Sequence, residues 1–136
     1  MIKKVALGSV GLLVGAVLVA TPAHAANGNA GGIAFSPDDG VHGWVNHVSD
    51  RDAAIDGSVA ACESNGGKSC VWAAWNANGC LALLVDQDGE WGGGIGPTAK
   101  QAVKDAVNDA AQNNITIDTQ TPVVSFCTWD QGPDQG

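Results

Sequence analysis

Residues 80–103 read CLALLVDQDGEWGGGIGPTAKQAV, and this stretch decides the fold of the chain. The unbroken apolar run at 80–85 predicts a central strand that is buried on both faces. Residues 86–89 carry the Asp and Gly that tight turns favour. We therefore expect residues 90–95 to return beside the first strand as the second half of a β-hairpin.

A helix is predicted directly after this hairpin. Pro97 and Thr98 are typical of a helix start, with Thr98 as the N-cap, and the helical pattern runs to about Gln112. The residues on its apolar face are small, so we expect the helix to pack closely on the sheet. They are Ala102, Val103, Ala106, Val107 and Ala110.

The preceding half of the chain has the same order of elements. Ser49 is expected to cap a helix over about 50–64, with Ile55, Val59 and Cys62 on its apolar side. The other elements predicted by the pattern are strands at 33–36, 41–48 and 70–75, a turn at 37–40, a brief strand at 115–117 and a firmer one at 123–127.

A shift of 48 to 49 residues superimposes the two halves. It places Ile33-Ala34 on Leu81-Ala82, Gly40 on Gly89, and Ser49 on Thr98. We interpret this as an internal duplication of a ββαβ-like unit whose two copies share one core. The sequence thus predicts an α+β fold with a mostly antiparallel sheet, two helices and two disulfides.

The amino-terminal segment has the pattern of a signal peptide over residues 1–25. Lys3 and Lys4 precede an apolar run of 16 residues, and Ala23-His24-Ala25 is a typical cleavage sequence. That run is shorter than the ~20 residues a membrane-spanning helix needs. We expect a secreted protein without stable membrane insertion: a flexible leader at 26–32, one domain at 33–129 and a loose tail at 130–136.

Composition limits the possible partners. The 136 residues include 14 acidic and 6 basic side chains, which give a formal net charge of −8. Nucleic acid is an unfavourable partner for such a chain, because its phosphates require clustered Lys and Arg. No cofactor is expected either. The pattern G-x-G-x-x-A at residues 94–99 matches a dinucleotide-binding fingerprint by letter, but the helix start explains the same residues.

Four cysteines follow the predicted signal peptide: Cys62, Cys70, Cys80 and Cys127. An even number of cysteines in an exported chain indicates disulfides, and four allow three pairings. We favour Cys62–Cys70, which closes a Gly-containing turn, and Cys80–Cys127, which ties the last strand to the middle of the chain. Zinc is disfavoured because the spacings contain no C-x-x-C pair.

Tryptophan is the unusual residue type, with five Trp and no Tyr in the chain. Exposed Trp commonly anchors interfaces. We take Trp44, Trp75 and Trp91 as candidate binding residues, the last because three glycines follow it. Trp72 and Trp75 lie three apart on a predicted strand, so we expect them to face opposite sides and only one of them to be exposed.

The charged residues suggest two weaker alternatives. Asp86, Asp88 and Glu90 place three carboxylates within five residues, which makes them a minor calcium candidate although turn chemistry also explains them. His42 and His47 are five apart on a strand and therefore face opposite sides, so they are not expected to share a metal ion. Either one, acting with a nearby carboxylate, would suit acid–base catalysis.

Several short motifs resemble a known family, the domain of unknown function 4189. They are Ala34-Phe35-Ser36, Gly43-Trp44, Ala60-Ala61-Cys62, Cys70-Val71, Asn78-Gly79-Cys80-Leu81-Ala82 and Gly92-Gly93-Gly94. The resemblance covers about 33–128 and implies an exported, cysteine-bearing bacterial domain of actinobacterial type, with host contact suspected for some members. It implies no agreed activity, so no catalytic residue is carried over.

These observations favour a non-enzymatic binding module that acts outside the cell on a protein or an envelope component. The alternative is a small extracellular hydrolase that uses carboxylate and histidine chemistry. A cavity in which acids and a histidine converge would favour the hydrolase. An apolar surface around a Trp would favour binding.

Overall fold

The computed structural model describes residues 28–130, so the predicted signal peptide, residues 26–27 of the leader and residues 131–136 of the tail lie outside it. The fold is α+β, as predicted. Its elements in chain order are β2 (Ala30–Ser36), β3 (Val41–Val48), α3 (Arg51–Ser64), β4 (Val71–Ala77), β5 (Cys80–Val85), β6 (Trp91–Gly96), α4 (Ala99–Gln112) and β7 (Val124–Cys127). No helix within residues 28–130 is long and apolar enough to cross a membrane.

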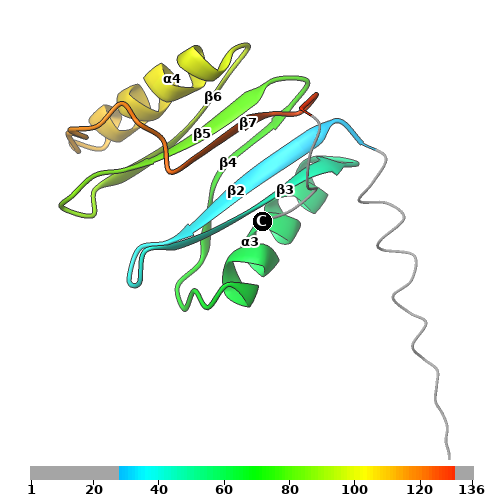
Figure 1. Ribbon diagram of the computed structural model, residues 1–136, viewed down its shortest axis with the longest axis horizontal. Helices are drawn as coiled ribbons and strands as arrows, with labels where there is room; N and C mark the ends of the chain where they lie inside the picture. The colour runs from blue at the N-terminus through cyan, green and yellow to red at the C-terminus, as the bar shows by residue number, and fades with distance from the viewer. Residues whose placement is uncertain (1–27, 131–136) are drawn as a thin grey trace, which may run out of the picture.

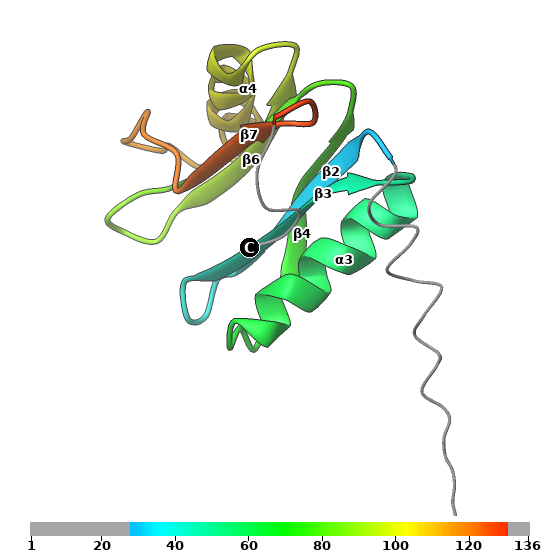
Figure 2. The same cartoon turned by 45° about the vertical axis from the view of Figure 1, so that its right-hand side comes forward.

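The strands form two antiparallel sheets of three strands each, with orders β3-β2-β4 and β6-β5-β7. In both sheets the first strand is central, its hairpin partner lies on one side, and the strand after the helix lies on the other. The two sheets face each other, and each helix covers the outer face of its own sheet (Figures 1 and 2). The layers are therefore helix, sheet, sheet, helix.

Alternating side chains on the two central strands build this arrangement. Ile33 and Phe35 of β2 meet Leu81 and Leu83 of β5 in the core between the sheets. The neighbouring residues on each strand, such as Leu84, point to the helices instead. Both faces of β5 are thus covered, as its unbroken apolar sequence predicted.

Glycines let the helices approach their sheets closely. A Cβ atom on Gly94 would lie 2.2 Å from the carbonyl oxygen of Ala102, and one on Gly92 would lie 2.6 Å from that of Ala106. Gly43 faces α3 in the same way. The glycines after Trp91 are therefore explained by packing rather than by a need to expose that ring.

The helix ends depend on short side-chain caps. Thr98 caps α4, as predicted, because its hydroxyl accepts the N–H of Gln101 at 3.2 Å. The prediction for α3 was wrong by one residue, since the Asp50 carboxylate accepts the N–H of Ala53 at 2.9 Å and takes the place expected for Ser49. The fully buried residues of α3 are Ala54, Ser58 and Cys62. Of the predicted apolar side, Cys62 is therefore confirmed, whereas Ile55 and Val59 are only partly buried.

Two strand predictions also differ from the structure. Strand β2 begins at Ala30, within the segment expected to be a flexible leader, because Ala30 pairs with Val48 on one side and Ala77 on the other. Residues 115–117 form no strand. Ile117 is instead buried against Leu84 beneath α4.

Both predicted disulfides are present, Cys62–Cys70 and Cys80–Cys127. Cys80 and Cys127 are also register partners on β5 and β7, so the second disulfide fixes a strand of four residues at the edge of its sheet. The first disulfide joins the end of α3 to the start of β4. Each disulfide therefore lies within one sheet-and-helix half of the molecule.

Candidate functional site

A groove of about 390 Å³ lies beside β4, β6 and α4. Three tryptophans from two strands line it: Trp72 and Trp75 from β4, and Trp91 from β6. Ile95 extends this apolar lining, and Asp105 and Asp109 of α4 supply two carboxylates. We call this the tryptophan groove.

An irregularity in β4 brings Trp72 and Trp75 to the same side. Ile33 of β2 pairs with Ala74, whereas the next residue, Ala34, pairs with Trp72, so Ala73 is an extra residue in the ladder. Trp75 pairs with Gly32, which lies on the same face as Ala34. The expectation that the two tryptophans face opposite sides was therefore wrong.

The remaining tryptophans differ in their surroundings. Trp91 packs against Phe35, with ring centroids 5.4 Å apart, and its partly buried side chain lines the groove. Trp44 packs against Phe126 at 5.1 Å between the sheets and does not line the groove. Of the three candidate binding residues, the structure thus brings together Trp75 and Trp91, and it adds Trp72.

The acidic side of the groove comes from one face of α4. Asp105 and Asp109 are four residues apart, which places both on the same side of the helix. The Asp105 carboxylate accepts the N–H of Ile95 at 2.9 Å, so it covers part of the outer edge of β6. Sequence reasoning missed both residues, although the Asp-x-x-x-Asp spacing on a predicted helix was a usable signal.

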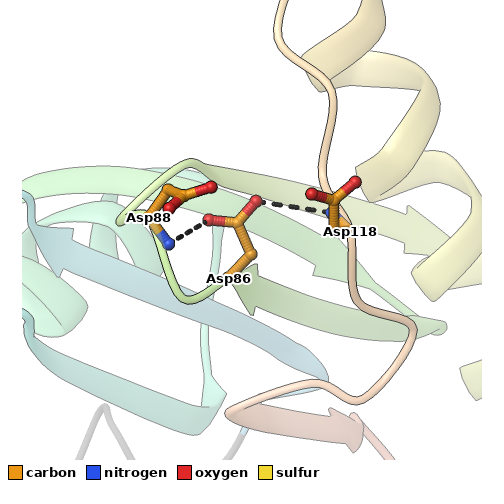
Figure 3. Close-up of side chains that lie close together, drawn as sticks. All are labelled: Asp86, Asp88 and Asp118. Carbon is orange, nitrogen blue, oxygen red and sulfur yellow. Dashed lines mark hydrogen bonds between the residues drawn. The ribbon is translucent and has the colours of Figure 1, made fainter.

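A second cavity, of about 300 Å³, contains an acidic cluster. Carboxylate oxygens of Asp86, Asp88 and Asp118 all lie within 4.8 Å of one another (Figure 3). Asp118 comes from the chain after α4, 32 residues from Asp86. The cluster therefore contains two of the three residues taken as the calcium candidate, and Asp118 stands in place of Glu90.

Hydrogen bonds from backbone N–H groups explain why residue 86 is an aspartate. One of its carboxylate oxygens accepts the N–H groups of Asp88 at 2.9 Å and Glu90 at 3.0 Å, and the other accepts that of Asp118 at 3.3 Å (Figure 3 draws the first and last). This pattern shapes the β5–β6 turn and attaches the chain after α4 to it. We assign Asp86 a structural role on these contacts.

Replacing Asp86 with alanine should destabilise the protein by about 2 kcal/mol, because three N–H groups lose a charged acceptor. Asp86→Asn should cost less, since its amide oxygen still accepts. Asp88→Ala is the matched control and should leave the free energy of unfolding nearly unchanged. Urea unfolding measures all three, and equal losses for Asp86→Ala and Asp88→Ala would contradict the assigned role.

The acids and histidines of the first half lie elsewhere. Within residues 28–130, no histidine lines either cavity. The ring Nε2 of His47 lies 3.0 Å from the carbonyl oxygen of Asp130, and the carbonyl of His42 accepts the side-chain amide of Asn65.

Asp39, in the β2–β3 turn, also lies away from both cavities. Its pKa is lowered because a hydrogen bond with Ser36 and a second one from the N–H of Lys68 stabilise the charged carboxylate.

Comparison with known proteins identifies a family and no individual relative. No curated protein matches the chain, and no solved structure matches it. A family model described as a domain of unknown function, DUF4189, matches residues 30–127. That match includes all eight strands and helices of the described structure. The chain therefore belongs to the DUF4189 family.

Proposed function

We propose that the protein is a non-enzymatic binding module that acts outside the cell, and that the tryptophan groove is its binding surface. The partner is a protein or a component of the cell envelope, and host material is included among the candidates. The main observation behind this proposal is that Trp72, Trp75 and Trp91 all line one groove, with Trp72 exposed and the other two partly buried.

The exposure of the groove supports binding. Trp72 is 47% exposed and Ile95 is 42% exposed, although both are large apolar residues on sheet-edge strands. Water contact at such side chains is unfavourable, and a partner that covers them gains free energy from their burial. Tryptophan is also enriched among the residues that dominate binding energies.

Secretion is the second part of the proposal. The signal-peptide pattern at residues 1–25 supports export, and two disulfides are typical of an oxidising compartment. The bacterial, actinobacterial-type origin implied by the sequence motifs belongs to the same proposal, as does the duplication of a ββαβ-like unit as the origin of the two halves.

The geometry gives less support to a hydrolase. Carboxylate and histidine chemistry needs an acid and a base within reach of one substrate atom. The described acidic cluster gathers Asp86, Asp88 and Asp118 without a histidine in its lining, and Asp86 is engaged by three N–H groups. Binding is therefore the function that the arrangement favours.

Trp72→Ala is expected to weaken retention of a partner by tenfold or more, because the most exposed aromatic ring of the groove is removed. Trp129→Ala is the matched control, since Trp129 is 57% exposed and does not line the groove. The immobilised oxidised protein and both variants are exposed to envelope and extracellular extracts, and the retained proteins and glycans are quantified. Equal retention by all three would contradict the groove as the binding surface.

A further inference from the structure

The two strands that border the tryptophan groove are both edge strands. Among the described strands, β4 pairs only with β2 and β6 pairs only with β5. An edge strand presents backbone N–H and C=O groups that a further strand can pair with, and proteins usually protect such edges with charges, proline or covering side chains.

The two edges are protected differently. On β6, the Asp105 carboxylate already accepts the outward N–H of Ile95. On β4, the sequence VWAAWNA contains no charged residue and no proline. The first two side chains of β4 are apolar and exposed: the exposed fraction is 43% for Val71 and 47% for Trp72. Around Trp72 and Trp75, the edge of β4 is therefore the less protected of the two.

The hydrogen-bond pattern shows which groups of β4 point away from β2. Asn78 donates its N–H to the carbonyl of Asn29, so Asn78 faces β2. Antiparallel pairing alternates, so Ala77 and Trp75 direct their backbone groups outward. The N–H of Ala77 is accepted by the Asn76 side chain at 2.8 Å, which agrees with this orientation. Trp75 therefore offers an N–H and a C=O at the open edge within the groove.

The charge of the opposite wall limits what the added strand can carry. Asp105 and Asp109 are exposed and line the groove. The basic residues of that helix, Lys100 and Lys104, do not line the groove. Within residues 28–130 the one ion pair joins Arg51 and Asp52, so neither groove carboxylate is paired with a basic side chain. A strand with a lysine or arginine facing α4 is favoured here, whereas a second copy of this acidic chain would add negative charge.

We infer that the groove binds an extended, basic peptide segment of a partner protein, which pairs with the edge of β4 as a fourth strand of the sheet β3-β2-β4. This rests on the proposed function and names its partner class. Backbone pairing supplies affinity in this mode, and alternate side chains supply specificity. Apolar residues of the segment contact Trp72, and its basic residues face Asp105 and Asp109.

Three blocked seven-residue peptides test this inference against the full oxidised protein: alternating Val and Lys, alternating Val and Glu, and the Val–Lys peptide N-methylated along one edge. We expect the Val–Lys peptide to bind and the other two to bind at least tenfold more weakly. Binding should slow the hydrogen exchange of the Trp75 amide. Asp109→Asn should weaken binding severalfold, and Asp56→Asn, on the exposed side of α3, should not.

Several outcomes would overturn the inference. N-methylated and unmodified peptides of equal affinity would exclude backbone pairing, and equal affinity of the Glu and Lys peptides would exclude the role of charge. A dimer that dissociates on Trp72→Ala would assign the edge to a second copy. Groove binding by an oligosaccharide, with no peptide bound, would exclude a peptide partner and leave the proposed function standing. If nothing binds in a Trp72-dependent way, both fail.

Discussion

Gly94→Ala is expected to destabilise the protein by about 3 kcal/mol, which corresponds to a loss of roughly 12–24 °C in the midpoint of thermal unfolding. The added Cβ would lie 2.2 Å from the carbonyl oxygen of Ala102 and 2.3 Å from the backbone nitrogen of Ala106. Both are helix backbone atoms, so no side-chain rotation relieves the overlap and α4 has to move off the sheet. Circular dichroism at 222 nm during heating measures the change.

Gly89→Asn is the matched control for this prediction. Gly89 has a φ of +85° in the β5–β6 turn, and no atom lies within 4 Å of the place its Cβ would take. Asparagine tolerates this backbone region better than most residues, so the cost should be about 1 kcal/mol or less. If Gly94→Ala proved as mild as Gly89→Asn, close helix packing would not be the reason for glycine at residue 94.

Replacing both Cys80 and Cys127 with alanine should cost about 4 kcal/mol, the value the chain-entropy model gives for a closed loop of this length. The two cysteines are 47 residues apart, and their disulfide limits the unfolded chain much more than a short loop does. Such a loss is a large part of the total stability of a small domain. Urea unfolding of the oxidised wild type and the double variant gives the difference.

The Cys62→Ala/Cys70→Ala double variant provides the comparison. Its cysteines are only 8 residues apart, so the same model gives a loss of about 2.5 kcal/mol. The larger loss should thus occur in the second half of the molecule. Losses that are equal, or reversed in order, would show that native contacts of the disulfides outweigh their effect on the unfolded chain.

Features set by neighbouring residues were predictable from the sequence. Thr98 caps α4 because its hydroxyl bonds three residues ahead, and residues 86–89 turn because Asp86 accepts nearby N–H groups and Gly89 adopts a positive φ. The buried strand at 80–85 followed from its apolar run alone. The cysteine pairing followed from the predicted order of elements. Cys62 and Cys70 lie on either side of a short turn, and Cys127 lies in the last predicted strand.

Features set by distant partners were not predictable. The extra residue at Ala73 exists only in the register between β4 and β2, and it decides that Trp72 joins Trp75 in the groove. Asp118 joins Asp86 across 32 residues of chain. Asp109 gains its place in the groove from how α4 lies on β6. A single sequence gives the local spacing of these residues but not the register or docking that brings them together.

The placement of the two disulfides has a consequence for the integrity of the molecule. Cys62–Cys70 and Cys80–Cys127 lie on either side of Asn78 and Gly79, which connect β4 to β5. A single proteolytic cut between those two residues would yield two fragments with no covalent link. Non-covalent contacts, such as that of Phe35 with Trp91 and that of His47 Nε2 with the Asp130 carbonyl oxygen, would then hold them together. Each fragment would retain its own crosslink, so the protein is a natural candidate for reconstitution from separately produced halves.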